Sequence, residues 1–303
     1  MLGYFGPAGT FTHQALLTFS DAEAVPFPTV AQALDAVRSG QVDAVLVPIE
    51  NSVEGGVTVT LDALANGRRL MIVREVLLPV QFNLYARPGT RLADVRRVLT
   101  HPHSAAQTRE WMATHLPGAV VTEGGSNAAS AQEVSDPASG YDAAICGQVA
   151  GELYGLEPVA TEIADNSSAV TRFVLVSRPA EPPAPTGADK TTMVAYMHAD
   201  RAGALLEILE QFSGRGVSLC RIESRPTKTG IGNYCFSIDA EGHLRDPRVA
   251  EAMLGLHRIC EEVIFLGSYA RADGIRPEVA RGFTDADFAA AREWYAGLVH
   301  PED

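Results

Sequence analysis

The sequence contains little lysine and few cysteines. Only two lysines occur in 303 residues, and the 24 basic side chains are outnumbered by 37 acidic ones. The formal net charge of −13 argues against a nucleic-acid partner, because such partners are bound through basic patches. The cysteines Cys146, Cys220, Cys235 and Cys260 form no C-x-x-C pair. We therefore expect mostly buried thiols, with neither a disulfide framework nor a metal site.

Long apolar runs and a leader-like N-terminus are also missing. The longest apolar stretches, such as residues 71–73 and 76–80, are interrupted by charge well before the ~18 residues that a membrane span requires. Residues 1–7 contain neither a basic segment nor an apolar segment of signal-peptide length. The sequence therefore predicts a cytoplasmic protein without a membrane partner.

A proline-rich stretch divides the chain. Four prolines fall within residues 179–185, and proline neither continues a helix interior nor donates a hydrogen bond within a central strand. We predict a first domain over 1–178, a linker over 179–189, a second domain over 190–270 and a helical tail over 271–303.

The first segment alternates short apolar strands with amphipathic helices. Apolar residues from Val30 to Val37 recur at helical spacing between a capping Thr29 and a terminal Gly40. Residues 44–47 form a continuous apolar run, as in strands that are buried on both faces. Further strands are predicted over 2–5, 70–78, 81–86, 98–100, 120–122, 143–146 and 172–177. This alternation predicts an α/β fold with ligands at strand carboxyl ends and helix N-termini.

The second segment has a different rhythm. Strands are predicted over 191–197, 217–225, 232–239 and 263–266, with helices over 203–214 and 247–256. The order βαββαβ is that of a ferredoxin-like domain. In the tail, a helix capped by Thr284 is predicted to place Phe288, Trp294, Tyr295 and Leu298 on one general face.

Three polar segments lie where an α/β fold binds ligands. Residues 6–12 form either a plain glycine turn or an anion site made of free N–H groups and a hydroxyl. Residues 47–56 carry three adjacent polar residues before two glycines, which form either a site loop or an ordinary surface segment. The Thr171-Arg172-Phe173 triplet, taken alone, is compatible with an ordinary strand edge.

In combination these segments resemble a known family. With His101-Pro102 added, four segments occur in the order and spacing of the prephenate dehydratases: residues 6–12, Pro48–Ser52, His101-Pro102 and Thr171–Phe173. Two more are similar to motifs of the phenylalanine-sensing ACT domain attached to that family: Gly203–Leu206 and Glu223–Pro226. The resemblance covers the chain from Leu2 to about Tyr269.

The resemblance implies a two-lobed catalytic domain of the type II periplasmic-binding-protein fold, followed by a ferredoxin-like βαββαβ ACT domain. One lobe would comprise residues 1–80 and 160–178, and the other 81–159. The implied reaction is the decarboxylating dehydration of prephenate to phenylpyruvate, which requires no cofactor and no metal. Because no chorismate mutase segment precedes Leu2, we expect a monofunctional enzyme. We also expect feedback regulation by L-phenylalanine and a homodimer or homotetramer formed through the ACT domains.

The resemblance also implies roles for individual residues. Thr171, Glu50 and Arg172 would be catalytic, with Arg172 as a fork for a substrate carboxylate. Whether Thr171 or Glu50 assists the leaving hydroxyl stays open, because an aliphatic hydroxyl is a poor acid and a carboxyl in an apolar cleft can retain a proton. Substrate contacts are expected from Thr10, Asn51, Ser52, Gln107, Ser126, Asn127 and Phe173. Phenylalanine contacts are expected from Gly203, Ala204, Leu205, Glu223, Ser224, Arg225 and Asn233.

Two other functions share parts of this pattern. A lyase acting on arogenate, the aminated analogue of prephenate, would carry every motif, so only rate constants with both substrates separate the two. A small-molecule sensor could use the same bilobal fold without chemistry. The intact Thr171-Arg172-Phe173 triplet and the lack of a signal peptide count against a sensor, and an assay for phenylpyruvate tests it.

Overall fold

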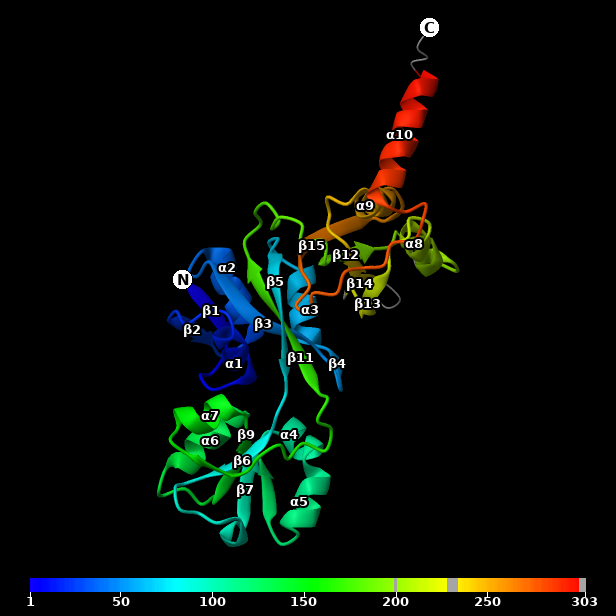
Figure 1. Ribbon diagram of the computed structural model, residues 1–303. Helices are drawn as coiled ribbons and strands as arrows, with labels where there is room; N and C mark the ends of the chain where they lie inside the picture. Colours follow the sequence, from blue (N-terminus) through cyan, green and yellow to red (C-terminus); the bar gives the residue numbers. More distant parts are fainter. Residues whose placement is uncertain (199–200, 228–233, 300–303) are drawn as a thin grey trace. The chain divides into compact units, whose positions relative to one another are not determined.

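The computed structural model of the chain describes residues 1–198, 201–227 and 234–299 and contains two compact units (Figure 1). The first unit comprises Met1–Thr60 and Val76–Leu175, and the second comprises Leu61–Glu75 and Val176–Asp303. The second unit thus takes in a piece of the segment that the sequence assigns to the first domain. The two units are not the predicted domains, and the predicted domain limits stay a prediction.

The first sheet has the strand order β2-β1-β3-β11-β5. Its strands are β1 (Leu2–Phe5), β2 (Ala24–Phe27), β3 (Ala44–Asn51), β5 (Met71–Pro79) and β11 (Val170–Ser177). β1 is parallel to β2 and β3, and α1 (Phe11–Leu17) and α2 (Val30–Ser39) contact these strands. As predicted, the Thr29 hydroxyl accepts a hydrogen bond from Gln32 N at 3.1 Å, and Gly40 ends α2 at φ 80°.

The second sheet has the strand order β10-β6-β9-β7-β8. Its strands are β6 (Asn83–Ala86), β7 (Arg97–Thr100), β8 (Val120–Glu123), β9 (Ala143–Cys146) and β10 (Glu157–Ala160). Its helices are η1 (Leu92–Asp94, 3-10), α4 (Pro102–Gln107), α5 (Arg109–His115), α6 (Asn127–Ser135) and α7 (Gln148–Leu153). The chain enters this sheet between β5 and β6 and returns to the first sheet between β10 and β11 (Figure 1). The predicted two-lobed α/β fold is confirmed.

Two predicted strand limits are wrong in a way that affects the site. β3 continues past its predicted end to Asn51, because β4 (Gly55–Gly56) pairs back on Glu50 and Asn51. β11 begins two residues earlier than predicted, at Val170, so Thr171 lies within the strand. The polar residues expected in a loop are therefore largely held by hydrogen bonds of the sheet.

Among the strands that the sequence does not predict, two contain a proline. β2 contains Pro26 and β10 contains Pro158, and a proline argues against a central strand. Both strands lie at the edge of their sheets, and the register of β10 shifts after Pro158. An edge strand tolerates the missing N–H group, which explains why these segments form strands despite their prolines.

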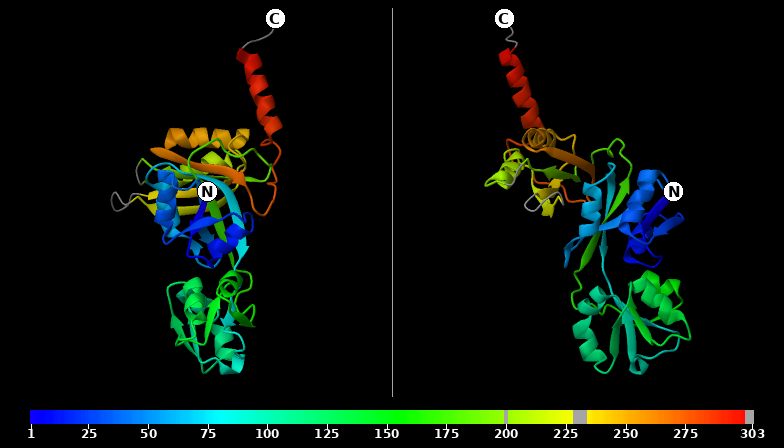
Figure 2. Two further views of the ribbon diagram at one scale, coloured as in Figure 1. Left: turned by 90° about the vertical axis from the view of Figure 1, so that its left-hand side faces the viewer. Right: turned by 180° about the vertical axis from the view of Figure 1, so that it is seen from behind.

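The second unit contains a four-stranded antiparallel sheet with the order β13-β14-β12-β15. Its elements are β12 (Asp189–Tyr196), α8 (Ala204–Ser213), β13 (Leu219–Pro226), β14 (Tyr234–Glu241), α9 (Pro247–Ile259) and β15 (Glu262–Ala270). Both helices cover one face of the sheet (Figure 2), where Ile208, Leu256 and Phe236 belong to one apolar core. The predicted ferredoxin-like order is confirmed. The unit also includes most of α3 (Thr58–Ala65).

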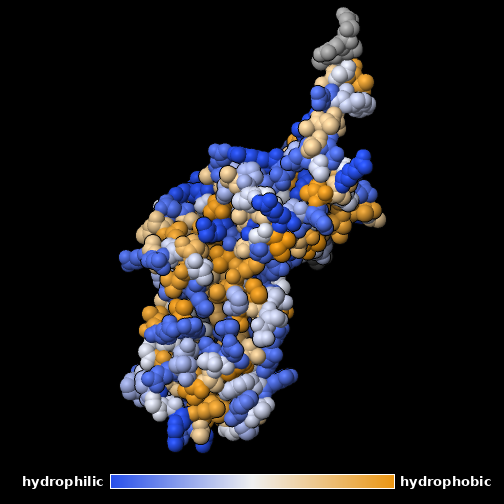
Figure 3. Space-filling view, viewed as in Figure 1, coloured by the Kyte–Doolittle hydropathy of each residue, from blue (hydrophilic) through white to orange (hydrophobic). Residues whose placement is uncertain are grey.

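The tail forms α10 (Asp285–Val299), whose predicted cap is present: Thr284 Oγ1 accepts from Asp287 N at 3.2 Å. Trp294, Tyr295 and Leu298 are 60–68% exposed, and Figure 3 shows apolar side chains at the end of this helix. In the single chain these side chains therefore face solvent. No helix in the described ranges is long and apolar enough to cross a membrane.

Candidate active site

The end of β3 and the start of β11 are joined by side-chain and backbone hydrogen bonds. Ser52 N donates to Val170 O at 2.9 Å, and Val170 N donates to Ser52 Oγ at 2.9 Å. Asn51 Nδ2 donates to Thr171 Oγ1, also at 2.9 Å. Three predicted site residues, Asn51, Ser52 and Thr171, are thus brought together although about 120 positions separate them in sequence.

The orientation of the Asn51 amide follows from its other contacts. Its Oδ1 accepts from Val53 N at 2.8 Å and from Glu54 N at 3.2 Å. Because the oxygen faces backbone donors, the amide nitrogen must face Thr171. An amide nitrogen only donates, so Thr171 Oγ1 is the acceptor of this bond. The hydroxyl proton of Thr171 therefore points away from Asn51 and is available to another acceptor.

The residues that flank Thr171 in sequence and space have distinct surroundings. Arg172 is 5% exposed, and its Nη1 lies 3.2 Å from Glu50 Oε2. The Glu50 side chain is 36% exposed, so the ion pair joins a buried guanidinium to a carboxylate that reaches solvent. Phe173 shares a face of β11 with Thr171, because side chains alternate along a strand. It is 1% exposed and packs in the core, which leaves no surface for the predicted substrate contact in this conformation.

A second group lies at the carboxyl end of β7 and the start of α6. Ser126 caps α6 by accepting from Ala129 N at 3.0 Å. Asn127 Oδ1 accepts from Ser104 Oγ at 2.9 Å and from His101 N at 3.2 Å. The Asn127 amide nitrogen has no partner in the described part of the chain, so it is the group that this residue can offer to a ligand. Sequence reasoning missed Ser104, whose buried hydroxyl gives no motif signal.

Glu54 and His103 connect the two groups. The Glu54 carboxylate contacts His103 Nδ1, and the His103 ring stacks on His101 with centroids 4.9 Å apart. Glu54 N is bonded to Asn51, and His101 N to Asn127. A continuous chain of contacts thus links Asn51 to Asn127. Burial lowers the pKa of His101, and the neighbouring His103 lowers it further.

Two predicted contacts are less directly connected to this site. The Thr10 hydroxyl donates to Pro7 O at 2.9 Å and accepts from His13 N at 3.4 Å, so it is engaged within its own loop. Gly9 N donates to His13 Nδ1 at 3.1 Å, and burial lowers the pKa of this histidine. Gln107 ends α4 half-buried, and its side-chain amide has no partner among the described residues.

Comparison with known proteins identifies the family. Residues 2–181 match the family model of prephenate dehydratase. The chain belongs to the prephenate dehydratase family. A prephenate dehydratase of Amycolatopsis methanolica is 47% identical, over 99% of this chain and 98% of the relative. The crystal structure of a prephenate dehydratase from Arthrobacter aurescens, in complex with L-Phe, is 52% identical with a TM-score of 0.93, and the match covers 98% of this chain and 99% of that chain.

Prephenate dehydratases are hydro-lyases that convert prephenate to phenylpyruvate, carbon dioxide and water. A structure named as a quorum-quenching acylase is also similar, with 30% identity, a TM-score of 0.81 and coverage of 89% of this chain and 97% of that chain. Because one fold supports different chemistries, the site residues determine the reaction. Within the described ranges, no group of three or more His, Cys, Asp or Glu side chains could hold a metal ion.

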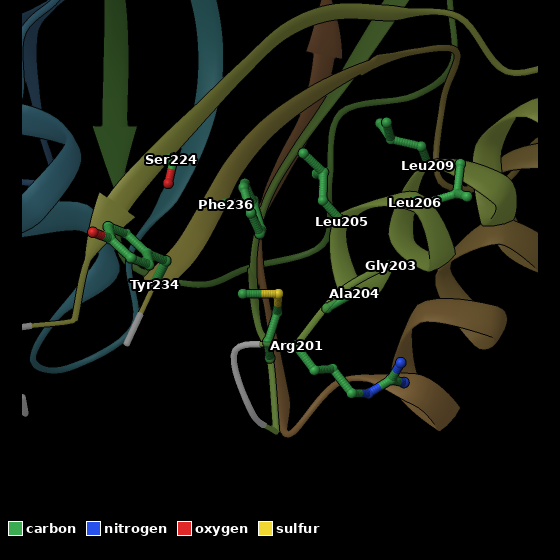
Figure 4. A pocket seen from close by; sticks show the side chains of 10 residues that line it. Arg201, Gly203, Ala204, Leu205, Leu206, Leu209, Ser224, Tyr234 and Phe236 are labelled. Atoms are coloured by element: carbon green, nitrogen blue, oxygen red, sulfur yellow. The ribbon is translucent and has the colours of Figure 1, made fainter. Parts of the chain in front are cut away.

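The second unit of the chain contains a separate pocket of about 520 Å³ between α8 and strands β13 and β14 (Figure 4). Gly203 precedes α8 with φ 89°, a left-handed conformation that favours glycine. Figure 4 shows Ser224 and Tyr234 on the strand side. The lining is largely apolar and consists of Met197, Arg201, Gly203, Ala204, Leu205, Leu206, Leu209, Ser224, Tyr234 and Phe236.

Four of the residues predicted to contact phenylalanine line this pocket: Gly203, Ala204, Leu205 and Ser224. Glu223 and Arg225 do not, because they lie on the other face of β13, where Arg225 Nη2 is 2.8 Å from Asp62 Oδ1. Asn233 lies outside the described residues. Sequence reasoning missed the apolar lining, although the alternation of Tyr234 and Phe236 at the start of β14 indicates a common face.

Proposed function

We propose that this chain converts prephenate to phenylpyruvate with Thr171 as the hydrogen-bond donor to the departing hydroxyl. The bond to the ring carboxylate breaks, its electrons enter the ring, and carbon dioxide leaves. The bond between the ring and its hydroxyl oxygen also breaks. The oxygen leaves with both electrons of that bond and takes up a proton to form water. Because the ring becomes aromatic, the protein needs mainly to hold the dianion and stabilise the leaving oxygen.

The hydrogen bond from Asn51 to Thr171 is the observation that carries this assignment. By accepting from Asn51, the Thr171 hydroxyl is oriented to donate its own proton outward, and hydrogen bonds in series strengthen one another. An aliphatic hydroxyl is a poor acid, so Thr171 donates a short hydrogen bond or relays a proton rather than supplying one alone. Glu50, the rival donor, is engaged as an acceptor by Arg172.

The remaining polar groups are proposed to hold the two substrate carboxylates. Arg172 supplies positive charge beside Glu50, and the amide nitrogens of Asn127 and Gln107 supply uncharged donors. Ser52, Ser126 and Thr10 complete the proposed contacts from the ends of neighbouring elements. Phe173 supports Thr171 from the core and is no longer assigned a direct contact.

Substitutions of Asn51 test the direction of the hydrogen bond. In Asn51→Asp the carboxylate still accepts from the backbone of residues 53 and 54, but it also accepts the Thr171 proton. Asn51→Ala removes both contacts and leaves that proton available. We expect kcat of Asn51→Asp to fall roughly tenfold below that of Asn51→Ala, a difference of about 1.4 kcal/mol. Equal rates for the two variants would show that Asn51 only holds the loop.

Turnover assays separate the candidate functions. We expect phenylpyruvate to form from prephenate in the absence of added metal or cofactor. A higher kcat/KM with arogenate than with prephenate would identify an arogenate dehydratase instead. Substrate binding without any product would identify a sensor. The assay of both substrates on one preparation therefore distinguishes all three functions.

We also propose that L-phenylalanine inhibits the enzyme from the pocket between α8 and β13. The pocket offers N–H groups at the start of α8 for a carboxylate and apolar side chains for a benzyl group. β13 is an edge strand, and it could pair with the same strand of a second chain to enclose the ligand and form a homodimer. Coupling of ~1–3 kcal/mol between effector and substrate would be typical. The alternative is that this unit only dimerises the enzyme.

Filling the pocket tests the effector site. Ser224→Phe places a ring into the pocket from a strand position, where aromatic residues are favoured. We expect calorimetry to show phenylalanine binding weakened about tenfold or more, because overfilling a packed site typically costs about 1–3 kcal/mol.

The matched control is Ile222→Phe, on the same face of β13 but outside the pocket lining, which should bind phenylalanine as the unmodified chain does. If the unmodified enzyme neither binds millimolar phenylalanine nor slows in its presence, only the dimerisation role remains.

A further inference from the structure

The pocket and α3 lie on opposite faces of the same strand, one residue apart. Ser224 lines the pocket, and Arg225 points to the opposite face because successive side chains of a strand alternate. There, Arg225 Nη2 and Nε lie 2.8 Å and 3.2 Å from Asp62 Oδ1. Both side chains are less than one-fifth exposed, so solvent screens this ion pair only partly. A ligand that displaces β13 must therefore strain or move the contact with Asp62.

The first turn of α3 is bonded to the strand that carries Glu50 and Asn51. Thr60 Oγ1 donates to Pro48 O at 2.6 Å, and Val57 N donates to Ile49 O at 2.8 Å. Gly55–Gly56 pairs with Asn51 and Glu50 just before the helix begins. The eight residues of α3 thus connect an ion pair on the effector strand to the backbone that positions Asn51 against Thr171.

Three further contacts hold residues 61–75 within the second unit. Tyr196 donates to Ala65 O at 3.0 Å, Arg69 pairs with Glu262 at 2.6 Å, and Lys190 pairs with Glu75 at 2.9 Å. Their partners lie on β12 and β15. Of these three contacts and Arg225–Asp62, only the last involves β13, the strand that lines the pocket.

We propose that the Arg225–Asp62 ion pair and α3 transmit the effector response to the catalytic residues. The proposal rests on the proposed binding of phenylalanine in the β13–α8 pocket and assigns Arg225 to coupling rather than to ligand contact. Phenylalanine favours one position of β13, Arg225 carries Asp62 with it, and α3 alters the β3–β4 backbone that orients Asn51. A ligand shifts an equilibrium only through such differential contacts.

Asp62→Asn tests this assignment, because it keeps the shape of the side chain and removes its charge. In the unmodified full-length enzyme, saturating phenylalanine should reduce kcat/KM by roughly 5- to 150-fold. In Asp62→Asn we expect this factor to fall close to one. Turnover without phenylalanine should stay within about twofold, because the hydrogen bonds that hold Asn51 and Thr171 do not involve the Asp62 side chain. Calorimetry without substrate should give a phenylalanine Kd within about threefold of the unmodified value.

The matched control is Glu262→Gln, which makes the same carboxylate-to-amide change in an ion pair of residues 61–75 that does not involve β13. It should retain the full response. The combination of Asp62→Asn with Arg225→Gln should lose no more response than either change alone, because the two residues act as a pair. The inference is overturned if Asp62→Asn responds normally, if Glu262→Gln loses as much, or if Arg225→Gln alone abolishes phenylalanine binding. An unmodified enzyme that does not bind phenylalanine would instead overturn the proposed effector site itself.

Discussion

Thr171→Ala is expected to lower kcat by ~10² or more while KM changes little, because positioned acid assistance contributes about 10²–10⁴ to a rate. The alanine variant removes the hydroxyl that Asn51 orients but leaves β11 and its hydrogen bonds in place. Steady-state kinetics with prephenate measure the effect. Thr171→Ser should retain much of the rate, since it keeps a hydroxyl that can accept from Asn51 and donate to the substrate.

Glu50→Gln provides the decisive comparison. If Thr171 assists the leaving group, Glu50→Gln should be less damaging than Thr171→Ala, because the amide can still fill the position beside Arg172. A nearly normal Thr171→Ala together with an inactive Glu50→Gln would transfer the role to the carboxyl group.

The sequence predicts the location of the site better than its internal geometry. Sequence motifs identify Thr171 and Glu50, but the apolar run predicts that β3 ends at Val47. The strand continues since Gly55–Gly56 pairs back on it, and such pairing between neighbouring segments has no periodic signal of its own. The contact between Asn51 and Thr171 joins residues about 120 positions apart and could not be predicted from either segment alone.

The effector motif illustrates a second limit. Glu223, Ser224 and Arg225 are adjacent in sequence and were predicted to share one role. In a strand only alternate residues share a face, so Ser224 lines the pocket and Arg225 contacts Asp62. The alternation of faces follows from the predicted strand. The partner of Arg225 does not, because Asp62 lies in a distant part of the sequence and only the structure shows the contact.

Arg172→Lys is expected to lower kcat/KM. The loss of transition-state stabilisation should be ~1.5–3 kcal/mol, the contribution of a hydrogen bond to a charged group. Lysine keeps the charge but loses the planar fork, and it must be accommodated where the arginine is 5% exposed and 3.2 Å from Glu50. Kinetics on Arg172→Lys and Glu50→Gln measured together check the result. Arg87→Lys is the control for a general loss of stability. It removes a half-buried guanidinium that donates to Val134 O at 2.6 Å, and it should lower stability without changing kcat/KM.

The division between kcat and KM then shows what Arg172 does. If the guanidinium binds a substrate carboxylate in both the ground state and the transition state, KM should rise and kcat should change less. If it only positions Glu50, Arg172→Lys should lower kcat at constant KM and should add nothing to the effect of Glu50→Gln in the double variant. An unchanged kcat/KM would remove Arg172 from the site altogether. The ion pair with Glu50 would then serve only to hold the end of β3 against the start of β11.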